Sequence, residues 1–301
     1  FEKLLQSTGR TLESMFSQLS GAIVNLIFDP ILIFGLLGFP KLGVKGAAIA
    51  TVAGQFTGAT VGLLLNLKRN PDVTFRLKGF RPDLLIIFEI YKVGLPTIFM
   101  QCVGSVMTYT MNRILIVFST TATAVFGVYF KLQSFVFMPL FGMNSGMVPI
   151  IAYNYGAKMR KRMISTIRVA TVIAVGIMLV GLFIFQVFPT QLFMLFDASE
   201  HMLSMGDPAL RVISLHFPIA AVCIVFGSSF QALGNGVYSL VVSLIRQVVV
   251  LLPVAYLLSR LGDVYYVWWS FPIAEVASLI VSTICMIRIY KQVIGKVPEG
   301  A

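Results

Sequence analysis

Asp29 is the residue whose position most strongly suggests chemistry, because it lies within an otherwise apolar run from Gly21 to Leu37. Asn25 precedes it by four residues, which puts the Asn25 amide and the Asp29 carboxylate on one helix face, one turn apart. Pro30 cannot donate a backbone hydrogen bond, so the carbonyl of Leu26 is left free to accept. These oxygens suit Na⁺, and the carboxylate alone can carry a proton.

The alternative is a structural Asp29 that caps a helix or bonds to a neighbouring one. A charged group in hydrocarbon costs about 2.5 to 3.5 kcal/mol at a helix centre and tends to be retained for a purpose. We therefore favour a cation site at Asn25 and Asp29, the only metal-ion site that we expect.

Other polar residues at membrane depth are interpreted as lining a substrate cleft or as satisfying one another structurally. They are Gln55, Gln101, Lys131, Asn144, Arg246 and Glu275. Arg246 and Glu275 fall on what we take to be adjacent helices, so an ion pair that neutralises both is the economical expectation. Lys131 is a candidate for facing a water-filled cleft.

The elements that must position these residues are apolar helices. Of the 301 residues, 57% are hydrophobic and only 12% are charged, and the mean hydropathy of +0.90 is far from that of a soluble domain. The apolar blocks are roughly 20 residues long or longer, which is the length that spans a bilayer. We predict an all-α polytopic bundle with eight spans near residues 14–36, 45–67, 88–118, 123–153, 167–188, 207–232, 239–259 and 267–289. Prolines inside several spans, Pro218 and Pro253 among them, favour kinks.

The net charge of +11 follows the connections between these spans. One alternating set of connections, including both ends, holds sixteen basic residues, whereas the opposite set holds only Lys41, Lys45 and Arg260. This asymmetry predicts a multi-pass protein of the inner (plasma) membrane, surrounded by lipid, with both chain ends in the cytoplasm. Nucleic acid is not an expected partner, because no basic face is interleaved with aromatic residues.

Catalysis is not predicted. The three cysteines Cys102, Cys223 and Cys285 lie in apolar spans without CxxC spacing, and two histidines cannot build a metal site. No nucleophile–base pair, metal-ligand spacing or Gly-rich phosphate loop is present, so we expect neither an enzyme nor a cofactor, and the absence of a filter signature disfavours a channel.

A weak internal repeat and one polar stretch suggest how the chain is organised. Aligning the sequence with itself at a shift of 225 residues matches four identical pairs: Gln6–Gln231, Gly9–Gly234, Ser14–Ser239 and Leu19–Leu244. After a four-residue gap, Ala53 also aligns with Ala274. The polar stretch 68–83 indicates a boundary. We predict that residues 1–70 end one bundle, that 71–83 form a cytoplasmic linker and that 84–301 form a six-helix bundle. Because the chain opens on Phe1 within a predicted cytoplasmic connection, we interpret it as a fragment.

Several segments resemble the multidrug and toxic compound extrusion family. NLIFDPILIF followed by LGVKGAAIATVAGQ is similar to the paired fifth and sixth helices of that family. GLPTIFMQ, FGMNSGMVPIIAYNYGAK, QALGNG and WWSFPIAEV follow in the order of its C-terminal lobe. The resemblance covers essentially the whole chain, which would then hold helices 5 to 12 of a two-lobe, twelve-helix transporter, about its C-terminal two-thirds.

The resemblance implies a monomeric antiporter that expels amphipathic, often cationic, compounds in exchange for H⁺ or Na⁺, its lobes opening alternately to either side of the membrane. It assigns the cation site of the first lobe to Asn25 and Asp29, with a hydroxyl from the following helix, here Thr51. Some relatives carry an acidic residue shortly after GLP in the seventh helix, but this chain has only Gln101 there. A lipid-linked oligosaccharide flippase of a related two-lobed group is the alternative, for which Lys131 and Arg246 would supply positive charge.

Overall fold

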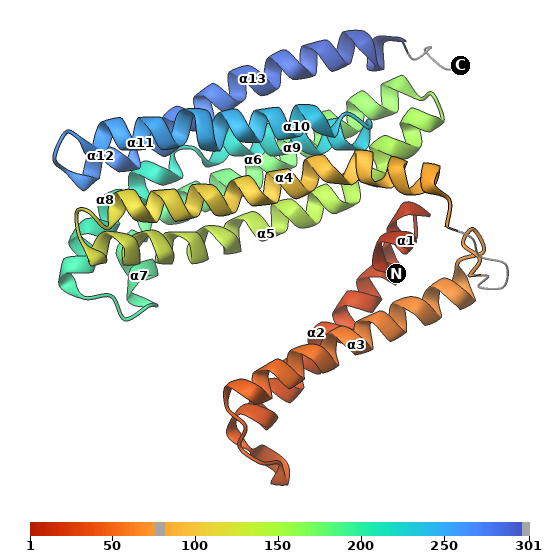
Figure 1. The fold of residues 1–301 in the computed structure, drawn as a ribbon, viewed down its shortest axis with the longest axis horizontal. Coiled ribbons are helices and arrows are strands. Elements are labelled where there is room, and N and C mark those ends of the chain that lie inside the picture. The colour runs from red at the N-terminus through yellow and green to blue at the C-terminus, as the bar shows by residue number, and fades with distance from the viewer. Residues whose placement is uncertain (76–81, 297–301) are drawn as a thin grey trace. The chain divides into compact units, whose positions relative to one another are not determined.

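The computed structural model describes residues 1–75 and 82–296, and within these ranges the chain is helical with no β-strand (Figure 1). The elements are α1 (Glu2–Ser7), α2 (Thr11–Phe34), η1 (Leu36–Gly38), α3 (Val44–Arg69), α4 (Leu84–Leu115), α5 (Thr120–Gly156), α6 (Arg160–Val187), α7 (Pro189–Met194), α8 (Glu200–Ser214), α9 (Phe217–Ala232), α10 (Gly236–Leu244), η2 (Ile245–Leu251), α11 (Leu252–Ser259), α12 (Val264–Trp268), α13 (Ser270–Gln292) and η3 (Ile294–Lys296). Residues 76–81 of the predicted linker, and 297–301 of the last predicted bundle, lie outside the described residues.

The predicted all-α membrane bundle is confirmed. Seven helical runs in the described part of the chain are long and apolar enough to cross a membrane, and counting one bent pair as a single span raises the number to eight. Hydrogen bonds within each helix satisfy the backbone, which is the condition for crossing hydrocarbon.

The sixth predicted span, 207–232, is not one continuous helix. It consists of α8 and α9, which meet at an angle of 49°. Pro218 stands in the first turn of α9 and has no N–H to bond back to α8, so the break lies at one of the predicted proline kinks. The span also begins earlier, at Glu200, because the Ser199 side chain caps α8 by accepting a hydrogen bond from the Met202 amide.

The seventh span, Gly236–Ser259, contains the π-helical segment η2. Besides Val242, its buried residues recur at every fourth position: Ser239, Ser243, Gln247, Leu251 and Ala255. With about 3.6 residues per α-helical turn, such a stripe would drift around the helix by about 40° per step. The wider turns of a π-helix rotate the stripe back, so one side of the span faces the interior throughout.

The described helices group into two compact units, Phe1–Pro82 and Asp83–Ala301. The first unit is the hairpin of α2 and α3 with the short α1 against its open end. The second unit contains α4 to η3.

Small residues bring α2 and α3 of the first unit into backbone contact. Along α3, Gly46, Ala50, Gly54, Gly58 and Gly62 recur every four residues on the side that faces α2. The Ser17 hydroxyl on α2 donates to the Gly58 carbonyl at 2.8 Å. Close packing through small residues is a common way for helices to associate in lipid, where the hydrophobic effect offers little.

A buried amide network closes the end of the hairpin that carries α1. The Asn66 side chain donates to the carbonyls of Phe1 and Gly62, at 3.0 and 2.8 Å, and the Asn70 side chain donates to Thr8 and Asn66. Both asparagines are almost fully buried. The network ties α1 to the hairpin.

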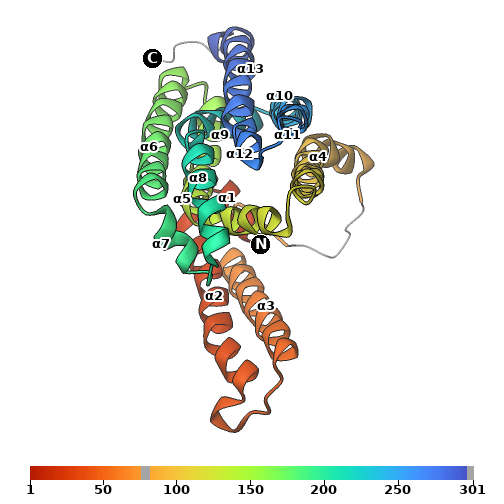
Figure 2. The same ribbon diagram turned by 90° about the vertical axis from the view of Figure 1, so that its left-hand side faces the viewer.

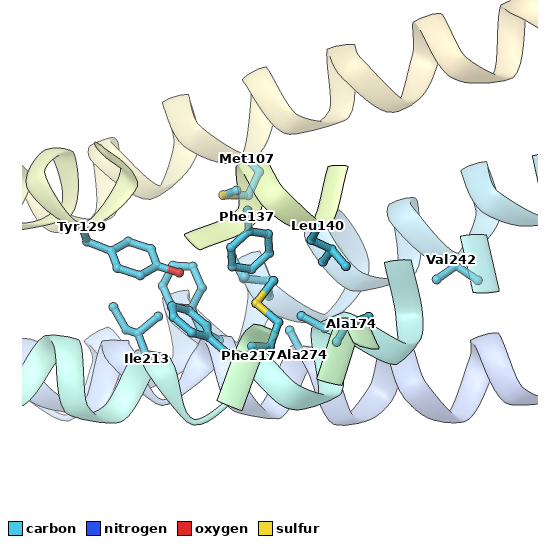
Figure 3. Packing of buried hydrophobic residues seen from close by; sticks show 14 of the residues in the cluster. Met107, Tyr129, Phe137, Leu140, Ala174, Ile213, Phe217, Val242 and Ala274 are labelled. Atoms are coloured by element: carbon cyan, nitrogen blue, oxygen red, sulfur yellow. The ribbon is translucent and has the colours of Figure 1, made fainter. Parts of the chain in front are cut away.

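In the second unit, α9 packs against α5, α6, α10 and α13, which places it at the centre (Figure 2). The core between these helices is apolar and rich in aromatic rings (Figure 3). Phe137 of α5 and Phe217 of α9 meet edge to face, with ring centroids 5.4 Å apart. The two units are therefore held together internally in different ways, by small residues in the first and by large side chains in the second.

Helix bounds agree with the repeat seen in the sequence. A shift of 225 residues carries α2, Thr11–Phe34, onto the seventh span, Gly236–Ser259. The following helices, α3 and α13, each pack against their predecessor in the same order. The internal repeat itself stays a prediction.

Gly46→Ala is expected to destabilise the protein by about 1 to 3 kcal/mol, because its Cβ would collide with the backbone carbonyl of Leu32. The matched control is Gly142→Ala on α5, where an added Cβ meets no atom within 4 Å. That change should be neutral or stabilising by up to about 1 kcal/mol, since alanine favours helices. Thermal unfolding in detergent measures both variants, and equal melting temperatures would contradict the close α2–α3 contact.

Candidate functional site

Asn25 and Asp29 lie on α2, half-buried and one turn apart. The Asn25 Nδ2 atom and the Asp29 Oδ1 atom are both buried, and neither has a hydrogen-bond partner among the described residues. Buried polar atoms are normally paired. The unpaired Asp29 oxygen can accept a cation from outside the chain, whereas the unpaired Asn25 Nδ2 is a donor, so Asn25 can contribute to a cation site only through its Oδ1.

The backbone at Asn25 lies at a close approach of the two helices. A Cβ on Gly54 would lie 2.6 Å from the Gly21 carbonyl oxygen and 2.9 Å from the Asn25 Cβ. A Cβ on Gly21 would in turn lie 2.7 Å from the Gly54 carbonyl oxygen. The absence of side chains at Gly21 and Gly54 thus sets where the Asn25 amide stands relative to α3.

A pocket of about 590 Å³ opens beside Asn25, on the surface formed by α2 and α3. Thr51 and Gln55 line it from α3, one turn apart. The structure therefore brings Asn25, Thr51 and Gln55 to one pocket, whereas Asp29, one turn further along α2, does not line it.

The Thr51 hydroxyl is exposed and donates its proton to the Ala47 carbonyl in the preceding turn of α3, at 2.9 Å. This bond uses the hydrogen and leaves lone pairs on the oxygen, so Thr51 can act as a neutral oxygen ligand toward the pocket.

Gln18 and Glu2 also line this pocket, although sequence reasoning did not single them out. Gln18 had a detectable signal: with Ala22, Asn25 and Asp29 it follows the spacing of one helix face. No sequence pattern indicated Glu2, because it lines the pocket only through the packing of α1 against the hairpin. Together these residues give the pocket a polar wall that continues from Asn25 toward α1.

The candidate residues of the second unit have different surroundings. Gln101 is exposed on α4. Lys131 is exposed on α5, with its ammonium group 5.6 Å from the centroid of the Phe196 ring, a cation–π contact. Asn144, also on α5, is buried, and neither its amide nitrogen nor its amide oxygen has a hydrogen-bond partner in the described structure.

The predicted pairing of Arg246 with Glu275 is present. Arg246 Nη1 lies 3.5 Å from Glu275 Oε1, with the Glu275 side chain only 5% exposed. The pair joins η2 to α13, two elements that pack against each other. Each charge therefore has its partner inside the second unit.

Within the described residues, no group of three or more histidine, cysteine, aspartate and glutamate side chains is placed to hold a metal ion. The candidate cation ligands in the first unit are instead one carboxylate, one amide and one hydroxyl.

Comparison with known proteins places these features in a family context. The family model MatE matches residues 96–257, more than half of the chain. The multidrug export protein MepA of Staphylococcus haemolyticus (strain JCSC1435) is 29% identical over 274 residues, which is 91% of this chain but 59% of that protein. The chain thus spans less than two thirds of the length of the curated relatives that it matches.

Solved structures of MATE proteins have the same fold. A MATE structure in the straight conformation matches with a TM-score of 0.87 at 25% identity, covering 96% of this chain and 65% of that one. A MATE structure in the bent conformation matches with a TM-score of 0.83 at 25% identity, covering 94% and 63%.

Thr51→Cys should react with a water-soluble maleimide about tenfold faster than Val52→Cys, because thiolate formation needs water and only Thr51 lines the pocket. Val52 is the matched control, since it is the next residue of α3 and is also exposed, at 64%. The measurement uses membranes of a Cys102→Ser variant, which removes the exposed native thiol. Equal rates would show that the pocket does not hold water.

Proposed function

Because the chain belongs to the MatE family, as its sequence motifs predicted, we propose that it is part of a cation-coupled exporter of small molecules. In this proposal residues 1–70 end the first lobe, 71–83 form a cytoplasmic linker and 84–301 form the second lobe. The exporter is a monomer in the plasma membrane, with both ends of this chain in the cytoplasm. The family consists of multidrug exporters rather than enzymes, which agrees with the prediction that no catalysis occurs.

The observation that carries the proposal is the unpartnered buried carboxylate oxygen on α2, Asp29 Oδ1. Among the described residues no basic side chain forms a salt bridge with Asp29. A carboxylate at this depth is costly unless its charge is neutralised, and here a mobile Na⁺ or a proton can do so. Asp29 is therefore the residue at which the coupling cation binds and leaves.

Coupling requires that the cation and the substrate favour different conformations. A ligand shifts a conformational equilibrium only by its differential affinity for the two states. We propose that the cation at Asp29 favours one state of alternating access and that the exported compound favours the other. Exchange then follows from competition between the two, without direct contact.

The substrate class is proposed as amphipathic or cationic drugs, in keeping with the multidrug export named for the MepA relative. Nothing favours the lipid-linked oligosaccharide flippase. Such a substrate carries phosphate and needs unengaged positive charge, but Arg246 is already paired with Glu275 and the Lys131 ammonium lies over an aromatic ring.

Asp29→Asn in the full-length protein should abolish ion-coupled export of a fluorescent cationic dye while leaving the protein folded and inserted, because the amide has nearly the shape of the carboxylate but cannot hold the cation's charge. The matched control is Glu200→Gln, which neutralises an exposed carboxylate in the first turn of α8 and should not change export. Dye export at the wild-type rate in Asp29→Asn would remove Asp29 from the mechanism.

Thr51→Ala distinguishes Na⁺ from H⁺ as the coupling ion. Na⁺ needs several oxygen ligands, so loss of the Thr51 hydroxyl should raise the half-saturating Na⁺ concentration roughly tenfold, which corresponds to about 1.4 kcal/mol. A proton needs only the carboxylate, and the pH dependence of export would then stay unchanged. Export in vesicles with imposed Na⁺ or pH gradients measures both. If export by the parent protein depended on neither the Na⁺ gradient nor the pH gradient, that result would contradict cation coupling.

A further inference from the structure

The second unit contains a buried carboxylate whose charge is balanced by the protein itself. The Arg246–Glu275 contact of 3.5 Å is longer than the roughly 2.7 to 2.9 Å of a charge-assisted hydrogen bond. Glu275 Oε1 accepts no hydrogen bond from the described residues. The pair is therefore held by attraction between charges and not by a shared proton.

The groups around this pair come from several helices. Tyr129 on α5, His216 at the start of α9 and Cys223 within α9 all lie within electrostatic reach of both Glu275 and Arg246. The Tyr129 hydroxyl is buried without a hydrogen-bond partner in the described structure. Of all these groups, only Arg246 is permanently positive.

The side of the pair that carries Arg246 is the more open one. The Arg246 side chain is 28% exposed, against 5% for Glu275. Arg246 stands on the π-helical turn, next to the inward-facing Gln247. The Arg246 guanidinium therefore approaches the Glu275 carboxylate from a partly open side. If that guanidinium were removed, a small cation could reach the carboxylate from the same side.

The internal repeat relates this pair to the helix contact of the first unit. The shift of 225 residues carries Gly21 onto Arg246, and the shift that aligns Ala53 with Ala274 carries Gly54 onto Glu275. Gly21 and Gly54 touch through their backbones, whereas Arg246 and Glu275 meet through charged side chains. In the predicted repeat, the same crossing point thus holds no charge in one unit and two in the other.

We propose that Arg246 is a tethered cation: it takes the place at Glu275 that a mobile Na⁺ or proton would occupy, and so limits the transporter to the coupling cation bound in the first unit. This inference deepens the proposed function and rests on it. Removing the guanidinium would leave a buried unpaired carboxylate, which is strongly unfavourable and must be neutralised by a mobile cation. Arg246 thereby sets how many cations bind per protein.

The test is the number of cations bound by the purified full-length protein, measured with radioactive Na⁺ and by proton uptake after a step in pH. Arg246→Gln should bind one cation more than its parent. Arg246→Gln combined with Glu275→Gln should lose that gain, and Arg246→Lys, which keeps a tethered charge, should show none. A folded Arg246→Gln protein with no gain, or a gain that survives in the double variant, would overturn the proposal.

Repeating the series with Asp29→Asn separates this inference from the proposed function. If Asp29 binds the coupling cation, the Asp29→Asn parent binds one cation fewer, and Arg246→Gln still adds one. If the proposed function is wrong, Asp29→Asn leaves binding unchanged, yet the difference between Arg246→Gln and the double variant persists.

If Arg246→Gln does not fold, chemical rescue of an Arg246 variant tests the same proposal. Arg246→Ala should recover folded yield and melting temperature when Na⁺ or ethylguanidinium replaces choline in the buffer, because a free cation fills the vacated place. Arg246→Ala with Glu275→Gln should not respond. Equal responses of the two proteins, or no response in either, would show that Arg246 acts only through its packing.

Discussion

A carboxylate within hydrocarbon must have its charge neutralised, and the two units of this protein meet that requirement in different ways. Glu275 is neutralised by Arg246, a side chain that cannot leave the protein. Asp29 has no basic partner among the described residues, and in the proposed function a mobile cation neutralises it. A carboxylate with a permanent basic partner stays neutralised whatever ions are in solution. A carboxylate without such a partner is neutralised to an extent that depends on the cation concentration and the pH.

The sensitivity of Asp29 is useful only if the surrounding helices hold their positions. The backbone contact between Gly21 and Gly54 provides this, because neither helix can approach further and neither residue has a side chain that can rearrange. On α2 the contact at Gly21 lies one turn before Asn25, and on α3 the contact at Gly54 lies one turn after Thr51. The amide and the hydroxyl are therefore attached next to the helix crossing, and the carboxylate is one turn further along α2. The pocket beside them exists because α3 presents small residues and short polar side chains there.

Much of this arrangement was predictable from the sequence. Apolar block length predicted the spans, and Pro218 predicted one kink, because both signals act within a single segment. The Arg246–Glu275 pair was predictable because two opposite charges on neighbouring spans have few other partners. The contact of Gly54 with the Asn25 backbone was not, since the register between two helices depends on packing that periodicity does not encode. The π-helical segment was not predictable either, since α3 carries small residues with the same period of four from Gly46 to Gly62 and is α-helical throughout.

The contacts at the two helix crossings depend on distance in different ways. Dispersion between touching backbones falls steeply with separation, so the Gly21–Gly54 contact loses about a quarter to a half of its attraction if α2 and α3 part by about 0.5 to 1 Å. Attraction between charges falls only as the inverse of distance, so the Arg246–Glu275 contact weakens more gradually as its helices separate. The second unit also holds the 49° bend and the π-helical turn, both places where a helix departs from regular hydrogen bonding. The more distance-sensitive contact therefore lies beside the proposed cation site, and the less distance-sensitive one lies in the unit whose helices are bent.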